Sequence, residues 1–342
     1  MIMNIKHAGL VFMFVCFVAN HTLIAQDIHF SQFQTSPLNL NPAQSGFFQG
    51  SHRFSSNYKN QWQSVTTPYR TFSGTFDMRL FERNDKMDMI GGGLVFNTDK
   101  AGDANYGTTQ AYLNISYIKT LNRQNTQFIA FGIQPGFVQR SFDPDKLIFD
   151  SQYDGKKYDP DLPHGEFFDR NSFLFFDYGA GINWFYDRHK NTTYKAGVAL
   201  FHLNEPNQSV FNEPTAIVNR KLLAYFKMQF PYNENVDAYP ALFYARQGNF
   251  QEIIVGSHFK YIRNPEPFNY STFNMGLFLR FSDALIVAAG FDYLDYTFGV
   301  SYDINISRLN PASRYRGGLE LSLSYIIDSK KSYVKRMPCP IF

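Results

Sequence analysis

The stretch RTFSGTFDMRLF, residues 70–81, decides the fold because its side chains alternate in character. Successive side chains of a strand point to opposite faces of a sheet. One face of this stretch would carry Phe72 and Leu80, and the other would carry Asp77 and Arg79. The stretch therefore predicts a strand with one apolar and one polar face. What remains to decide is whether protein or lipid covers the apolar face.

The same alternation recurs along most of the chain, in about fourteen segments of about ten residues or more. The candidate strands are 52–62, 70–81, 88–97, 108–119, 127–140, 173–186, 193–203, 220–230, 237–246, 250–260, 271–281, 284–292, 294–304 and 317–328. Strands in soluble sheets average about five or six residues, whereas a tilted membrane strand needs about nine to eleven. Strand length and the even strand number therefore favour a barrel in a membrane.

The connections between these strands give a second signal. If the amino terminus is periplasmic, the three longest connections, 141–172, 204–219 and 305–316, all face outward. Inward turns such as 187–192 and 231–236 are short. Long outer loops with short periplasmic turns are typical of outer-membrane barrels. A secreted two-sheet sandwich or jelly roll would also alternate, and it is the alternative.

The predicted fold is thus all-β: an antiparallel transmembrane outer-membrane β-barrel of about fourteen strands with long extracellular loops. In this barrel the face that carries Phe72 and Leu80 would contact lipid, while Asp77 and Arg79 would face a polar lumen. The 37 Phe and 22 Tyr against two Trp agree, because aromatic residues favour strands and membrane interfaces.

The chain divides into four parts. Residues 1–25 have the layout of a secretory signal peptide, with an apolar run behind a short basic start. Residues 26–51 form an N-terminal docking segment, residues 52–328 the barrel, and residues 329–342 a basic periplasmic tail. Only Cys339 remains after removal of the signal peptide, so a disulfide framework is excluded.

Charge and hydropathy exclude other classes. The 32 Lys and Arg become 31 without the signal peptide and the 29 Asp and Glu are unchanged, so the net charge falls from +3 to +2. A nearly neutral chain with no basic block before its tail gives nucleic-acid binding little support. No later segment has about 18 consecutive apolar residues, which excludes helical membrane spans.

The docking segment is too apolar for a free tail, since it contains Phe30, Phe33 and Phe47. Pro37 and Pro42 disfavour a helix or a central strand there. We therefore expect this segment to dock against the lumen, the periplasmic mouth of the barrel or a partner protein.

Candidate catalytic and metal-binding residues are few. The outer loop 143–169 is rich in Asp and could offer oxygen ligands to calcium, but its spacing matches no EF-hand and a solvated, partner-facing loop is the alternative. Ser257 and His258 are adjacent on a strand and point to opposite faces, so they cannot form a nucleophile–base pair. No catalytic or cofactor motif occurs, and we expect no enzyme and no cofactor. The run Gly91–Gly93 predicts a kink, a bulge or close packing against a plug segment.

Several motifs resemble the PorP/SprF family of type IX secretion system membrane proteins. The matching residues are Phe30, Ser31, Gln32, Pro37, Asn41, Pro42, Ala43 and Gly46 near the start, Trp62 and Pro68 before the second strand, and His202, Leu203, Asn204 and Pro206 further on. The resemblance covers nearly the whole mature chain. Gln44 stands where the family pattern leads us to expect an aromatic residue soon after Asn-Pro-Ala.

The resemblance implies a non-enzymatic barrel in the cell outer membrane of a Bacteroidota-type cell, surrounded by outer-membrane lipid. It implies a role with the type IX secretion machinery in the export or surface attachment of a secreted protein or a gliding-motility adhesin. A periplasmic peptidoglycan-associated protein is a further implied partner. The motif residues are then candidate partner-interaction residues, and a general diffusion porin is the alternative function.

Overall fold

The structure is a computed structural model, and it describes residues 27–61, 67–82, 88–159, 161–163, 165–168, 170–188, 192–209, 214, 216–264, 270–308 and 310–327. The expected signal peptide, the expected periplasmic tail with Cys339, and Trp62 lie outside these described residues. What the sequence predicts for them stays a prediction.

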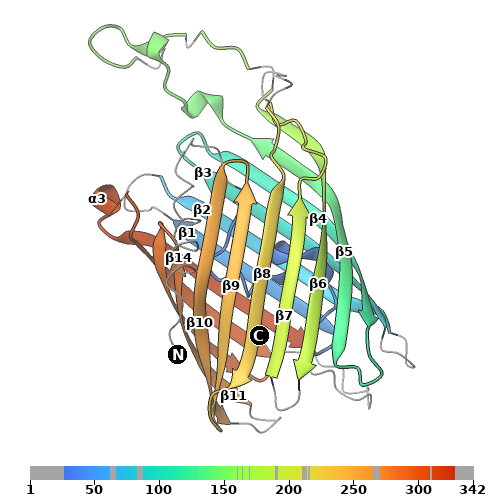
Figure 1. Ribbon diagram of the computed structural model, residues 1–342. Helices are drawn as coiled ribbons and strands as arrows, with labels where there is room; N and C mark the ends of the chain where they lie inside the picture. The colour runs from blue at the N-terminus through green and yellow to red at the C-terminus, as the bar shows by residue number, and fades with distance from the viewer. Residues whose placement is uncertain are drawn as a thin grey trace, which may run out of the picture.

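The described residues form one closed antiparallel barrel of fourteen strands, in which each strand pairs with its chain neighbours and β1 pairs with β14 (Figure 1). The strands are β1 His52–Gln61, β2 Tyr69–Glu82, β3 Met89–Ala101, β4 Tyr106–Thr120, β5 Gln127–Ser141, β6 Ser172–Arg188, β7 Thr192–Phe201, β8 Lys221–Pro231, β9 Val236–Gln247, β10 Phe250–Asn264, β11 Ser271–Arg280, β12 Ala284–Tyr293, β13 Tyr296–Asn305 and β14 Arg316–Ile327. The predicted barrel is confirmed, and the sandwich alternative is wrong.

The two faces of β2 have the predicted orientation. Phe72 and Leu80 are exposed on the outside of the barrel, whereas Ser73 and Asp77 are buried inside it. Alternating burial of this kind continues along β4, β5 and β6. Polar strand positions are therefore the buried ones, as expected for a barrel whose outer wall contacts hydrocarbon.

Some strand ends differ from the prediction. β3 continues to Ala101 and β10 to Asn264, because their pairing with β4 and β11 extends beyond the predicted ends. The inward connection after β10 is shorter than the sequence suggested for the same reason. Among the described residues, no helix is both long and apolar enough to cross a membrane.

Besides the strands of the wall, the described residues contain short helical turns. α2, Pro37–Leu40, and the 3₁₀ turn η1, Pro42–Gln44, belong to the N-terminal segment. The expectation that Pro37 and Pro42 disfavour a helix here was wrong, because each is the first residue of a single turn, where proline loses no hydrogen bond. The other short turns are in outer loops: η2 Pro144–Lys146, η3 Asp150–Gln152 and α3 Asn310–Ser313.

Candidate functional site

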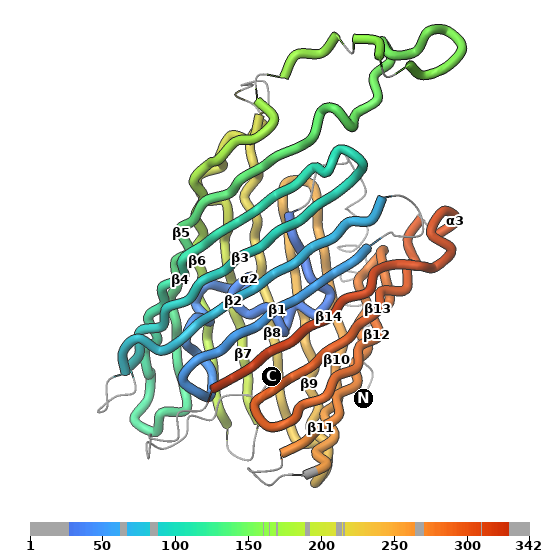
Figure 2. The backbone as a smooth tube through the Cα atoms, turned by 180° about the vertical axis from the view of Figure 1, so that it is seen from behind, coloured from blue at the N-terminus to red at the C-terminus, as the bar shows by residue number. Residues whose placement is uncertain are grey.

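Residues 27–50, here called the plug segment, lie inside the barrel (Figure 2). At its start Asp27 contacts Lys221 and Gln247, at the outer ends of β8 and β9. Near its end Phe47 packs on Phe128 and Phe185, toward the periplasmic ends of β5 and β6. The segment therefore runs down the lumen from the outer end and continues into β1. The sequence left open whether this segment docks in the lumen, at the periplasmic mouth or on a partner protein. In the structure it docks in the lumen.

Glu320 on β14 binds the outer part of the plug segment. Its carboxylate accepts hydrogen bonds from the backbone N–H groups of Ser31 at 2.7 Å and Gln32 at 3.0 Å. The side chain of Gln32 also donates to the backbone carbonyl of Glu320 at 3.2 Å. A buried carboxylate that accepts two N–H groups fixes both the position and the direction of the segment.

A charged network surrounds the Ser31 hydroxyl. Ser31 Oγ donates to Asp303 at 2.7 Å and accepts from Arg280 at 2.7 Å and from Lys59 at 3.2 Å. Arg280 also lies 3.2 Å from Glu252. These four charged side chains are buried, where a charge without a partner would be costly. The barrel thus holds compensated charges that one small plug residue bridges.

His202 joins the plug segment to the loop that follows β7. One ring nitrogen lies 2.8 Å from Asp177 and the other 3.4 Å from Asp27, which also pairs with Lys221 at 3.2 Å. Burial opposes the charged imidazolium, but the hydrogen bonds to Asp177 and Asp27 outweigh it and raise the pKa of His202 to about 9. Burial likewise works against the Asp27 carboxylate, yet Lys221 and His202 hold the pKa of Asp27 well below its usual value. The contact is therefore an ion pair at neutral pH.

Glycines in the strands receive the inner part of the plug segment. A Cβ on Gly132 would meet the backbone of Pro42 and Ala43, and a Cβ on Gly181 would meet the Asn41 side chain. The run Gly91–Gly93 leaves room for Ser45 of the plug segment, because a Cβ on Gly91 or on Gly93 would meet that residue. Packing against a plug segment, one of the three uses predicted for this run, is therefore observed, and the pairing of β2 with this run also shifts register between Arg79 and Phe81.

Asn41 and Gln44 satisfy buried polar groups. Asn41 caps η1 by accepting from the Ala43 N–H at 2.9 Å, and its amide donates to the Ile182 carbonyl at 2.9 Å. Gln44, where an aromatic residue was expected, donates to the Tyr225 hydroxyl at 2.9 Å and accepts from Lys195 at 2.6 Å. The amide at this position therefore has specific partners on β7 and β8.

The lumen is less polar than predicted. Phe128 and Phe185 point inward and form an apolar cluster with Phe47, while Phe33 stacks on Phe243 with ring centroids 4.9 Å apart. The expectation of a polar inner face was wrong at these positions. The plug segment brings its own apolar side chains, so the wall facing them is apolar too.

The sequence-predicted residues fall into two groups. Phe30, Ser31, Gln32, Pro37, Asn41, Pro42 and Ala43 are all in the plug segment and are buried or half-buried, and His202 contacts it. Leu203, Asn204 and Pro206 instead shape the outer turn after β7, where Asn204 donates to the Phe176 carbonyl at 2.7 Å. Pro68 precedes β2 at the outer rim.

Sequence reasoning missed the residues on the wall that hold the segment. Besides Glu320 and Arg280, these include Arg53, which forms a two-pronged pair with Asp77 at 2.8 and 2.9 Å. Asp77 also accepts from the Gly46 N–H at 2.8 Å. The sequence shows only that these residues are charged and lie at inward-facing strand positions. That pattern predicts that they face the lumen, but it does not predict which residue each one contacts.

The longest outer loop, between β5 and β6, extends away from the barrel (Figure 1). Ile148 is 73% exposed and Phe167 is 90% exposed, and Tyr153 is also exposed. Asp145, Asp150 and the other described acidic residues of this loop are exposed or half-exposed. Exposed large apolar side chains on one loop make it a candidate interaction surface.

Comparison with known proteins identifies the family. The chain belongs to the type IX secretion system membrane protein PorP/SprF family, whose model matches residues 22–325. The resemblance predicted from the motifs is confirmed. No curated protein matches the sequence.

Solved structures share the fold. The toluene transporter TbuX of Ralstonia pickettii is similar with a TM-score of 0.50 at 10% identity, over 85% of this chain and 92% of that one. The toluene transporter TodX of Pseudomonas putida has a TM-score of 0.47 at 11% identity, over 87% and 94%. A FadL homologue of Pseudomonas aeruginosa has a TM-score of 0.44 at 11% identity, over 85% and 94%. At such identities the likeness to TbuX concerns the barrel fold alone.

Proposed function

We propose that this protein is a non-enzymatic barrel of the cell outer membrane that supports export or surface attachment of a secreted protein or adhesin through its outer loops. The observation that carries the proposal is the plug segment: residues 27–50 occupy the lumen through buried hydrogen bonds and close packing. A lumen occupied by the chain itself argues against free diffusion, and the exposed outer loops then offer a surface for a partner. The family supplies the link to type IX secretion.

The outer loops supply the surface for a partner. The β5–β6 loop exposes Ile148, Tyr153 and Phe167 among acidic residues, and the turn after β7 lies at the same end of the barrel. Aromatic side chains are enriched at protein interfaces, where a few residues that become buried contribute most of the binding energy. In this proposal the cognate secreted protein binds these loops, and a periplasmic peptidoglycan-associated protein meets the opposite end.

The alternative function, a general diffusion porin, needs a continuous aqueous path. Fourteen strands could enclose one, since barrel width grows with strand number. The plug segment crosses the lumen and buries Arg53, Asp77 and Glu320, which argues against free diffusion. We therefore favour the secretion role.

A loop variant tests the proposal without disturbing the barrel. Replacing Ile148, Tyr153 and Phe167 together by Ala should leave a heat-modifiable barrel in the outer membrane but strongly reduce the amount of cognate partner at the cell surface. The matched control is Tyr232→Ala, which removes a 70% exposed aromatic from the periplasmic end. Equal surface display in the loop variant and the control would overturn the proposal.

Deletion of residues 27–50 provides a second test. We expect this deletion to leave the strands able to form a barrel but to abolish export or surface retention of the partner. Unchanged display after the deletion would show that the plug segment is not needed for the function.

A further inference from the structure

Two basic side chains lie next to each other on the outer wall. Arg70 on β2 and Lys100 on β3 are directly opposite across the ladder, and both are exposed at the outer ends of their strands. Directly opposed positions lie about 4.5–5.5 Å apart, and like charges there repel each other. No described residue forms an ion pair with either side chain. The arrangement favours binding of an anion between them.

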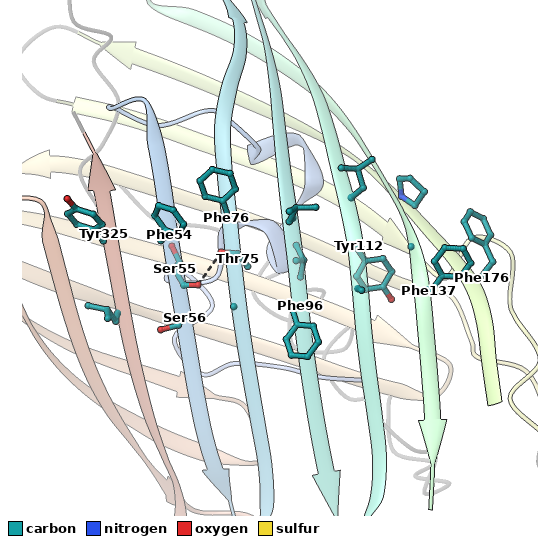
Figure 3. A pocket seen from close by; sticks show the side chains of 18 residues that line it. Phe54, Ser55, Ser56, Thr75, Phe76, Phe96, Tyr112, Phe137, Phe176 and Tyr325 are labelled. Carbon is teal, nitrogen blue, oxygen red and sulfur yellow. Dashed lines mark hydrogen bonds between the residues drawn. The ribbon is translucent and has the colours of Figure 1, made fainter. Parts of the chain in front are cut away.

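An apolar groove lies below this pair on the same wall. It has a volume of about 860 Å³, and none of the residues that line it is charged. Aromatic side chains border it from β1 to β6, among them Phe54, Phe96 and Phe176 (Figure 3). The groove is therefore an apolar depression in the part of the wall that contacts hydrocarbon.

Small outward-facing residues account for the groove. Ser56, Gly74 and Ala111 are small. Across the sheet Ser56 is opposite Gly74, and Phe96 lies between Gly74 and Ala111 as the partner of both. They follow one line of cross-strand partners over β1 to β4. At these positions the wall lacks the large side chains that cover it elsewhere.

The basic pair and the groove are in register. Gly74 follows Arg70 by four residues on one face of β2, and Lys100 follows Phe96 by four residues on the same face of β3. Four residues of strand span about 13 Å, so the charges lie about that far beyond the edge of the groove along both strands. A basic pair at this distance from an apolar groove matches a lipid, whose anionic headgroup would bind the charges and whose acyl chains would occupy the groove.

We infer that the wall from β14 to β6 binds a lipid with a phosphorylated headgroup. Arg70 and Lys100 hold the phosphate, and the acyl chains lie in the groove over Gly74 and Ala111. Arginine matches phosphate geometry with paired donors, and lysine adds a point charge. Binding would relieve the repulsion of the basic pair and fill the depression in the wall. The inference is independent of which secreted protein the barrel serves.

Native mass spectrometry of the purified full chain in neutral detergent can test the inference, with dimyristoyl phosphatidic acid as the probe. The wild type should bind this lipid, and the double variant Arg70→Gln/Lys100→Gln should bind it at least about tenfold more weakly. Gly74→Leu should also weaken binding, because it fills the groove. That change is sterically open, since a Cβ on Gly74 comes no nearer than 3.6 Å to another side chain.

Matched controls test whether binding requires this particular basic pair and whether it requires the lipid phosphate. Arg188→Gln/Arg246→Gln removes two exposed charges elsewhere on the barrel and should leave binding unchanged. Dimyristoyl glycerol, which lacks the phosphate, should bind at least about tenfold more weakly than the phosphatidic acid. Equal binding by wild type and the Arg70/Lys100 variant would overturn the inference. So would displacement of the lipid by inorganic phosphate, or equal binding of the neutral lipid.

Discussion

The two halves of the plug segment are held in different ways. Residues 27–36 are held largely by charges, since Asp27 pairs with His202 and Lys221, and Glu320 binds the backbone at Ser31 and Gln32. Phe33, stacked on Phe243, is their main apolar contact. Residues 37–48 depend mainly on close packing. There Gly132 and Gly181 leave room for the chain, and apolar clusters surround Leu38, Leu40 and Phe47.

The difference has consequences for how each half can move. Ionic contacts respond to pH and to single charge changes, whereas a segment packed against backbone moves only if the wall moves. The inner half is also joined to β1 at the periplasmic end. We therefore expect the outer half to be the part that loosens first, while the inner half keeps the lumen closed.

The largest effect should come from filling the glycine surface. Gly132→Val would place side-chain atoms onto the backbone of Pro42 and Ala43, which cannot move aside. We expect it to destabilise the plugged barrel by more than about 3 kcal/mol, measured as a lower melting temperature of the heat-modifiable form. Gly74→Val, on the outward face, is the control and should have little effect. Similar melting of both variants would contradict the packing role of Gly132.

The next largest effect should come from Glu320→Ala. Loss of its hydrogen bonds to Ser31 and Gln32 should loosen residues 27–36 by about 3 kcal/mol, visible as faster amide hydrogen exchange there. Exchange of residues 37–48 should stay slow. Glu205→Ala, which removes an exposed partner of Arg220, serves as the comparison. If both halves exchanged faster together, they would be one unit and the distinction between them would be wrong.

A smaller effect should come from pH, because the stability of the outer half of the plug segment depends on the protonation of His202. Its pKa is about 9 in the folded protein, above its ordinary value of about 6.5. Charged His202 therefore stabilises the outer half fully below about pH 6.5, and this contribution is lost as the pH rises through about 9. Exchange at residues 27–30, corrected for its intrinsic pH dependence, should show this step in the wild type. His202→Asn should remove it, and a step that survives would assign the titration to another group.

The smallest effects should come from neutral hydrogen bonds. Thr35→Val removes the acceptor of the Asn57 amide at 2.6 Å and the donor to the Gln32 carbonyl at 2.9 Å. It should lower the free energy of opening of the outer half by about 1 kcal/mol, measured as faster amide exchange. Ser116→Ala removes a bond of 2.6 Å to the Ser45 carbonyl in the inner half. We expect no change in exchange there, because packing against Gly91 persists. A larger effect of Ser116→Ala than of Thr35→Val would reverse the comparison.

The strands were predictable because one signal, the alternation of side chains, is local. Phe72 and Asp77 lie on opposite faces whatever the rest of the chain does. The lumen contacts were not predictable in this way. Ser31 and Glu320 are 289 residues apart, and no local pattern connects them. The short turns at Pro37 and Pro42 escaped prediction because proline is unfavourable within a helix and favourable at its first residue.

The site was therefore predictable in part. Family motifs indicated Asn41, Pro42 and His202 as important, but not that Asn41 binds strand carbonyls or that His202 pairs with Asp27. Gln44, a departure from the expected pattern, has two side-chain partners of its own. Such pairings depend on which residues closure of the barrel brings together, and that information is absent from any single stretch.

Planar-bilayer conductance of the purified full chain tests the closed lumen most directly. The wild type should show no large, stable channels at neutral pH, and deletion of residues 27–50 should open them. Glu320→Ala should remain closed, because the inner half stays packed against Gly132 and Gly181. Large, stable channels in the wild type would contradict a plugged barrel and would favour the diffusion porin.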